Sequence, residues 1–236
     1  MMQICIKQSV VLYHILNTMV CTSKELFKVV LTSKLNNLVH TGRYSGFQLL
    51  RQETVSDHIW GMISIALDIV PALNEQIKLR SKTREGESHI VKSIDIKDVI
   101  YRITIHDIDE ALCCDIPRPF KYANPEIRES IEKTTNQLME KEFEPQFIFE
   151  IHDSKNKSCI EGLLVAILDS LQAGIFMRNE VMLGNQFIKT EINNVIDMMD
   201  EFITVYIPKL ESPECIKEYL IDFLGYWIVE FSKHTK

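Results

Sequence analysis

The sequence of 236 residues has little glycine and proline, with 8 and 7 residues respectively. Collagen-like repeats, flexible linkers and low-complexity segments contain far more of these residues, so the composition excludes them. No stretch reaches the roughly 20 uninterrupted apolar residues of a membrane span, so no membrane partner is expected. The first 20 residues are mildly apolar, but Lys7 and His14 interrupt them and no small-residue cleavage site follows. We expect a helix there rather than a signal peptide.

The sequence has fewer basic than acidic residues. The chain has 26 Lys and Arg against 33 Asp and Glu, which gives a formal net charge of −7 with His neutral. Proteins bind long nucleic acids mainly through the phosphates, so an acidic chain is a poor candidate for such a partner. A small phosphate compound needs only one or two local cations or a metal ion. That class of partner stays open.

The six cysteines include no CxxC pair, and two of them, Cys113 and Cys114, are adjacent. The chain is too long for a small disulfide scaffold, and the adjacent cysteines argue against an ordinary disulfide framework. We expect buried, reduced thiols, which indicate a cytoplasmic protein.

Helical periodicity dominates what is present. An apolar stripe at helical spacing predicts a first helix, and we expect Pro71 to end it and residues 73–93 to form a loop. Its residues are Val55, Ile59, Met62, Ile63, Ala66 and Val70. Further helices are predicted from about Asp95 to before Pro117, from Asn124 to about Phe143, over residues 160–176, and after Ser212. No alternating strand pattern appears, so the prediction is an all-α protein with a single domain over residues 1–236.

Several ionisable residues fall where these helices should be apolar. His58 borders the stripe of the first helix, His106 and Asp107 continue the stripe of the second, and Glu110 lies one turn further along the same face. Charged groups in a core are costly unless they are paired or bind a metal. Two ordinary alternatives stay open. A core histidine can be satisfied by a hydrogen bond, and the second helix can turn to solvent near its end.

Asp169 is the only ionisable residue between Gly162 and Phe176. A salt bridge to a Lys or Arg is the simple explanation. With His58, His106 and Asp107 it also makes a ligand set that suits a first-row divalent metal. Such an ion activates water as a nucleophile. Glu110 could then orient that water or donate a proton to a leaving oxygen.

A second His-Asp dipeptide, His152-Asp153, closes a short apolar run before a polar loop, and we interpret it as a capping or surface feature.

The order of His58, His106-Asp107 and Asp169 along the chain resembles that of the HD-domain metal-dependent phosphohydrolases.

Two longer blocks resemble the bacterial HD-domain 5′-deoxynucleotidases. Arg43-Tyr44 stands fifteen residues before His58, and the block RQETVSDH ends at that histidine. The second block, HDIDEALCCDIPRPFKY, runs from His106 to Tyr122 with the spacing of the family. The resemblance covers roughly residues 35–180 and is compatible with a phage-encoded deoxyribonucleoside monophosphatase.

The resemblance implies an HD-domain helical bundle with a metal site between its helices, acting as a homodimer. It also implies a role for each matched residue. The metal ligands would be His58, His106, Asp107 and Asp169, the catalytic carboxylate Glu110, and the substrate-binding residues Arg43 for the phosphate, Tyr44 for the sugar pocket and Asp115 for the sugar near its 3′-hydroxyl. The ion would be Co, Mn, Zn, Ni or Fe.

Two residues depart from the family pattern. Tyr44 replaces a Trp, so it keeps a flat face but adds a hydroxyl, which leaves discrimination against the ribose 2′-hydroxyl open. Asp57 replaces a Glu, and we expect little effect. Arg51 with Glu53 is expected to form a structural ion pair, and Lys121 has either a surface role or a phosphate contact.

The leading hypothesis is a metal-dependent 5′-deoxynucleotidase that cleaves deoxyribonucleoside 5′-monophosphates. One alternative is an HD-type enzyme acting on dNTPs or signalling nucleotides. Only Arg43, Arg118 and Lys121 lie as cations in the matched blocks, which favours the monophosphate. The other alternative is a non-catalytic helical module that binds nucleotides or a protein.

Overall fold

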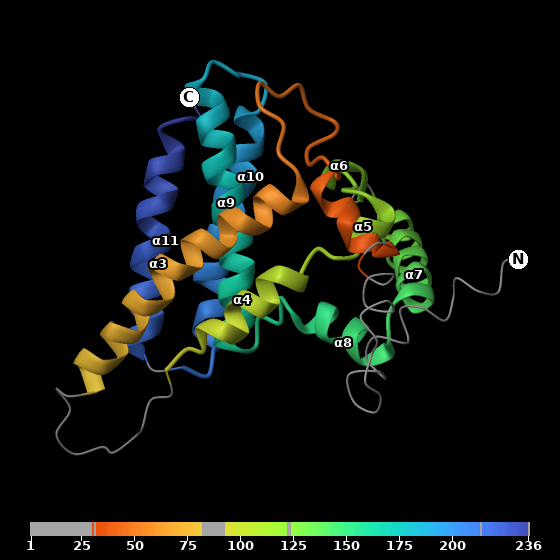
Figure 1. Cartoon of the computed structure of the whole chain (residues 1–236). Coiled ribbons are helices and arrows are strands. Elements are labelled where there is room, and N and C mark those ends of the chain that lie inside the picture. The colour runs from red at the N-terminus through yellow and green to blue at the C-terminus, as the bar shows by residue number, and fades with distance from the viewer. Residues whose placement is uncertain (1–29, 31, 82–92, 122–123, 213, 236) are drawn as a thin grey trace, which may run out of the picture. The chain divides into compact units, whose positions relative to one another are not determined.

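The computed structural model describes residues 30, 32–81, 93–121, 124–212 and 214–235 (Figure 1). Within these ranges the regular structure is helical, apart from one isolated antiparallel bridge between Gly42 and Thr54. The all-α prediction is therefore confirmed. The helix predicted for the first 20 residues lies outside the described ranges.

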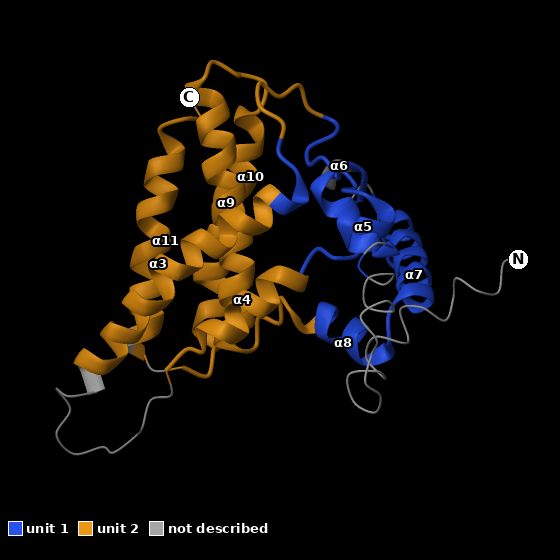
Figure 2. Cartoon of the chain, viewed as in Figure 1, with its two compact units in different colours: residues 1–46, 53–56, 106–152 blue, residues 47–52, 57–105, 153–236 orange. Residues whose placement is uncertain are grey.

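The chain divides into two compact units (Figure 2). Unit 1 consists of residues 1–46, 53–56 and 106–152, and unit 2 of residues 47–52, 57–105 and 153–236. The single domain expected over residues 1–236 stays a prediction.

Unit 2 is built around one buried helix. Its helices are α3 (Val55–Ser81), α4 (Ile96–Ile105), α9 (Ile160–Met182), α10 (Lys189–Glu201) and α11 (Glu214–Ser232), and α10 is followed by the short turns η2 (Phe202–Tyr206) and η3 (Ile207–Lys209). Helix α9 packs against α4, α10 and α11. By length and composition α9 could span a membrane, but 67% of the window that meets this criterion is buried inside the protein. The core helix of a globular protein has the same character.

Helix α3 continues past Pro71, so the prediction that it ends there is wrong. Pro71 itself is exposed, whereas Leu73 and Ile77 extend the buried stripe beyond it. Asn74 also holds the start of the next segment. Its side chain exchanges two hydrogen bonds with the backbone of Ile94, at 2.8 and 3.0 Å. Tertiary contacts therefore outweigh the local preference of proline to end a helix.

The helix predicted from Asp95 begins where expected, and the Asp95 carboxylate accepts the Lys97 N–H at 2.9 Å. It is shorter than predicted, because α4 ends at Ile105 and residues 106–109 form turns. Helix α9 extends beyond the predicted 160–176, and the last helix begins near Ser212 as predicted.

Unit 1 contains short helices around one longer helix. They are η1 (Lys34–Val39), α5 (Glu110–Cys113), α6 (Arg118–Lys121), α7 (Pro125–Glu142) and α8 (Pro145–Asp153). Helix α5 packs on η1 and on α7. The predicted start of α7 is confirmed, since the Asn124 side chain accepts the Ile127 N–H at 2.8 Å and Pro125 occupies the first turn.

Three cysteines are free, as expected for reduced thiols, but the expectation that they are buried is wrong. Cys114 is exposed, and Cys113 and Cys159 are half-buried. All three lie at turns or at a helix end, where apolar cover is incomplete.

A buried carboxylate near the end of α9 holds the segment that precedes the first motif. Glu180 is 1% exposed and accepts the backbone N–H groups of Leu50 and Arg51, at 2.7 and 2.9 Å. The Asn185 side chain donates to Glu180 and to the Gln48 carbonyl, at 2.9 and 2.8 Å. This network fixes residues 48–51 within unit 2.

We expect Glu180→Gln to lower the free energy of unfolding by about 1–3 kcal/mol, because an amide cannot accept from all three donors. Urea denaturation measures the change. Glu201→Gln, an exposed residue at the end of α10, is the control and should shift stability by less than about 0.5 kcal/mol. Equal effects of the two substitutions would contradict a structural role for Glu180.

Candidate active site

His58 and Asp169 lie together in unit 2. His58, on α3, is fully buried, and its Nε2 atom is 3.1 Å from Oδ1 of Asp169 on α9. The opposite ring nitrogen, Nδ1, donates a hydrogen bond to the side-chain oxygen of Gln172. Lys155 approaches the other carboxylate oxygen of Asp169 at 2.8 Å. The salt bridge considered for Asp169 is therefore present, beside the imidazole.

His106 and Asp107 follow the last residue of α4 directly. Both are largely buried, and Nε2 of His106 is 2.9 Å from Oδ2 of Asp107. The turn that begins at His106 places both side chains at the end of α4, where the sequence predicted a continuing helix.

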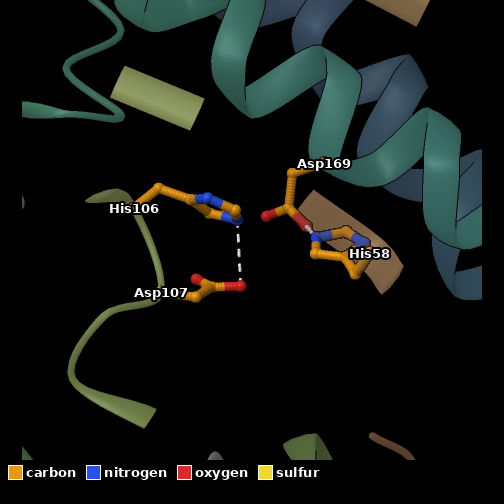
Figure 3. A group of neighbouring side chains, drawn as sticks. All are labelled: His58, His106, Asp107 and Asp169. Atoms are coloured by element: carbon orange, nitrogen blue, oxygen red, sulfur yellow. Dashed lines mark ion pairs between the residues drawn. The ribbon is translucent and has the colours of Figure 1, made fainter. Parts of the chain in front are cut away.

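One ligand atom from each of His58, His106, Asp107 and Asp169 lies within 4.8 Å of the other three (Figure 3). Two imidazole nitrogens and two carboxylate oxygens suit Zn, Mn, Co and similar ions. Protein ligands lie about 2.0–2.2 Å from such an ion, so a spacing of this order fits a common centre. The donor set therefore fits a divalent metal, although it does not select one.

Arg43 is held by a buried carboxylate in unit 1. Its guanidinium is 3.1 Å from Glu53, and its backbone N–H donates to the Glu53 carbonyl at 2.9 Å. The expected pairing of Glu53 with Arg51 is wrong. The bridge between Gly42 and Thr54 brings Arg43 opposite Glu53, and the side chain of Arg51 is exposed.

Tyr44 adopts a backbone conformation that is unusual for a large side chain. Its φ is 57°, in the left-handed region. Its N–H donates to Oδ2 of Asp115 at 2.9 Å, and the Arg43 guanidinium lies over its ring, 4.9 Å from the centroid. The two residues expected to contact the sugar are thus joined by a hydrogen bond.

Glu110 is a half-buried acid at the start of α5. Desolvation by burial, Asp107 and Asp115 together raise its pKa to about 9, against the opposing effect of Arg43. Its Oε2 atom is buried and has no hydrogen-bond partner within the part of the chain that the structure describes. In the metal-free protein Glu110 is therefore protonated at neutral pH and able to donate a proton.

Sequence reasoning missed Gln172 and Lys155, and it gave Glu53 the wrong partner. Gln172 carries a weak signal, since it lies three residues after Asp169 and therefore on the same side of α9. Lys155 belongs to a polar loop whose position relative to Asp169 only the fold reveals. The other His-Asp dipeptide is separate from the ligand group, and Asp153 binds Arg102 at 3.0 Å.

Over residues 31–209 the sequence matches the model of the YfbR-like 5′-deoxynucleotidase family. The chain belongs to this family. The resemblance inferred from the HD motifs is thereby confirmed. No curated protein sequence matches the chain significantly.

Three solved structures share the fold. A protein from Pyrococcus horikoshii OT3 is 21% identical, with a TM-score of 0.61 over 87% of this chain and 99% of its own. An HD-domain phosphohydrolase from Listeria innocua is 20% identical and has a TM-score of 0.54, and the match covers 88% of this chain and 98% of its own. The HD phosphohydrolase DatZ of cyanophage S-2L, bound to dA and one catalytic Zn²⁺ ion, is 12% identical. Its TM-score is 0.52, and the match covers 84% of this chain and 96% of its own.

These identities show the fold alone, whereas the family match extends to the activity class. The chain is therefore a member of a 5′-deoxynucleotidase family, and its group of two histidines and two aspartates could hold a metal ion.

We expect Glu110→Gln to stabilise the metal-free protein at pH 8 by about 1–3 kcal/mol. The pKa of Glu110 rises from 4.5 to about 9 on folding, so the folded state retains a proton that the unfolded state releases. Stability from this group therefore falls as the pH rises through that window, and a neutral amide avoids the loss. Urea unfolding in the presence of a chelator, from pH 5 to pH 8, measures the difference.

The difference should shrink towards pH 5. Glu140→Gln, an exposed residue of α7, is the control and should show no such pH dependence. A Glu110→Gln effect that stays constant across this pH range would show that the pKa of Glu110 is ordinary.

Proposed function

We propose that the protein hydrolyses deoxyribonucleoside 5′-monophosphates to a deoxynucleoside and orthophosphate. The observation that carries the proposal is the group of two imidazoles and two carboxylates, His58, His106, Asp107 and Asp169, with ligand atoms within 4.8 Å of one another. These four residues would hold the divalent ion. When bound, such an ion supplies Lewis acidity and activates water for attack on phosphorus.

Glu110 would act as the general acid. Attack by water breaks the bond between phosphorus and the 5′-oxygen, and that oxygen must take up a proton to leave as an alcohol. A half-buried carboxylic acid with a pKa of about 9 in the metal-free protein holds the proton needed. A cation bound by Asp107 would offset part of the negative charge that raises the pKa of Glu110.

Arg43 and Asp115 would select the substrate. Glu53 orients the Arg43 guanidinium, whose planar donors match a phosphate. One oxygen of Asp115 accepts the Tyr44 N–H, and the other is suited to accept from a sugar 3′-hydroxyl. The monophosphate is favoured over a triphosphate because a triphosphate requires several more cations.

We further propose that the enzyme is a phage-encoded cytoplasmic homodimer that acts on free nucleotides. The family resemblance supports the dimer. The net charge of −7 disfavours nucleic acid polymers as partners.

Purified protein supplied with Co²⁺, Mn²⁺ or Zn²⁺ should release orthophosphate from deoxynucleoside monophosphates, and a chelator should abolish the release. A panel of dNMPs, NMPs and dNTPs, with identification of the phosphorus product, measures this. Glu110→Gln should lower kcat about 10²–10⁴-fold while keeping the metal. Release of triphosphate from dNTPs alone would favour the triphosphohydrolase alternative, and a chain that binds no metal would favour a binding module.

Arg43→Lys should raise KM for dNMPs at least tenfold with unchanged metal content, because lysine lacks the planar pair of donors. His106→Ala is the matched contrast and should lose metal and activity together. Kinetics alongside elemental analysis separates the two effects. An unchanged KM in Arg43→Lys would remove Arg43 from phosphate binding.

A further inference from the structure

We propose that Gln172 is a positioning residue that fixes the ring orientation and tautomer of His58 and so sets the affinity of the site for its metal. This inference rests on the proposed function, because it requires His58 to bind the ion. Gln172 lies outside the motifs that carry the family resemblance.

The hydrogen bond between the two side chains determines which ring nitrogen carries the proton. The Gln172 side-chain oxygen faces Nδ1 of His58. A carbonyl oxygen only accepts, so the proton must lie on Nδ1. The lone pair of the neutral ring is then on Nε2, the atom that lies 3.1 Å from Asp169 Oδ1 within the ligand group. The amide therefore selects the tautomer that can bind a metal through Nε2.

Both groups are buried, so their geometry is well defined. His58 is 0% and Gln172 is 8% exposed. Gln172 follows Asp169 by three residues on α9, which places both side chains on one side of that helix. Helix α9 thus supplies one ligand directly and orients a second ligand on α3. Both helix segments belong to unit 2.

Gly61 provides the room that this contact needs. It lies inside α3, three residues after His58, where glycine is less favourable than alanine for helix stability. A Cβ at this position would lie 2.9 Å from Cγ and 3.1 Å from Nε2 of Gln172. Real side chains do not approach so closely, so a side chain at position 61 would force the Gln172 amide to move.

The simpler explanation is that Gln172 only fills space in the interior. The two explanations differ in what a substitution changes. Loss of a packing group lowers stability with or without metal, whereas loss of a positioning group lowers metal affinity. A carboxylate at this position would keep the acceptor for Nδ1–H, and a thioether of similar size would not.

The experiment compares Gln172→Met, Gln172→Glu and Ser170→Ala with the wild-type chain. Ser170 is buried on α9 and donates to the Ala166 carbonyl of the same helix, so it controls for disturbance of the helix. The dissociation constant for Zn²⁺ is measured by competition with a chelating indicator. Nitrogen-15 chemical shifts of the Zn²⁺-loaded protein report the His58 tautomer, with the signal assigned by its loss in His58→Asn. Thermal unfolding in chelator measures the stability of each metal-free variant.

We expect Gln172→Met to bind Zn²⁺ about 10–100-fold more weakly, the usual effect of removing such a partner. Gln172→Glu should stay within about threefold of the wild type, and Ser170→Ala should not change the affinity. The wild type should show a protonated Nδ1 and a metal-bound Nε2 on His58, a pattern that Gln172→Met weakens.

Equal Zn²⁺ affinity in Gln172→Met and the wild type would overturn this inference and leave the proposed function intact. Equal losses in Gln172→Met and Gln172→Glu would also overturn it. If Gln172→Met does not fold, Gly61→Ala carries the test, because it displaces the amide while favouring the helix. Gly61→Ala should weaken Zn²⁺ binding without lowering the metal-free melting temperature, and unchanged binding would refute the inference. A wild-type chain that binds no metal would instead refute the proposed function.

Discussion

The burial of ionisable side chains beside apolar helix faces is the constraint on which the rest of this molecule depends. His58 is completely buried, yet both of its ring nitrogens face polar groups, Gln172 on one side and Asp169 on the other. An unpaired ionisable group in such a place would cost several kcal/mol. The helices that form the core of unit 2 must therefore be placed so that these side chains meet, and the same placement assembles part of the candidate metal site.

Three carboxylates show how differently this cost is met. The burial cost of the Glu180 carboxylate is offset by two backbone N–H donors and one side-chain amide donor, and these hydrogen bonds hold a loop. Asp169 is shared between Lys155 and His58. Desolvation and the neighbouring carboxylates raise the pKa of Glu110 to about 9, so this group avoids the cost of a charge by keeping its proton. Of the three, Glu110 is the one that holds a proton at neutral pH in the metal-free protein, and this difference supports its proposed role as the general acid.

The sequence predicted those features that depend on neighbours along the chain. The Asn124 cap, the polar loop before α9 and the isolated carboxylate of Asp169 all follow from local patterns. Features set by distant segments escaped prediction. Gln172 lies 114 residues from His58, and the opposition of Arg43 and Glu53 depends on the bridge between Gly42 and Thr54. The prediction that the first helix ends at Pro71 failed for the same reason, because the burial of Leu73 and Ile77 outweighs the local cost of proline.

The residues proposed to select the substrate, Arg43, Tyr44 and Asp115, are coupled through the backbone as well as through side chains. Tyr44 holds a left-handed φ of 57°, which costs a bulky residue roughly 1–2 kcal/mol, and the Asp115 carboxylate stabilises it by accepting the Tyr44 N–H. Removing Asp115 would therefore release the Tyr44 backbone, and the Tyr44 ring would shift from its present place under the Arg43 guanidinium. The effects of substitutions at these two positions should not add, since each residue shapes the environment of the other. A substitution at position 44 is therefore expected to change the surroundings of the Asp115 carboxylate as well as the ring itself.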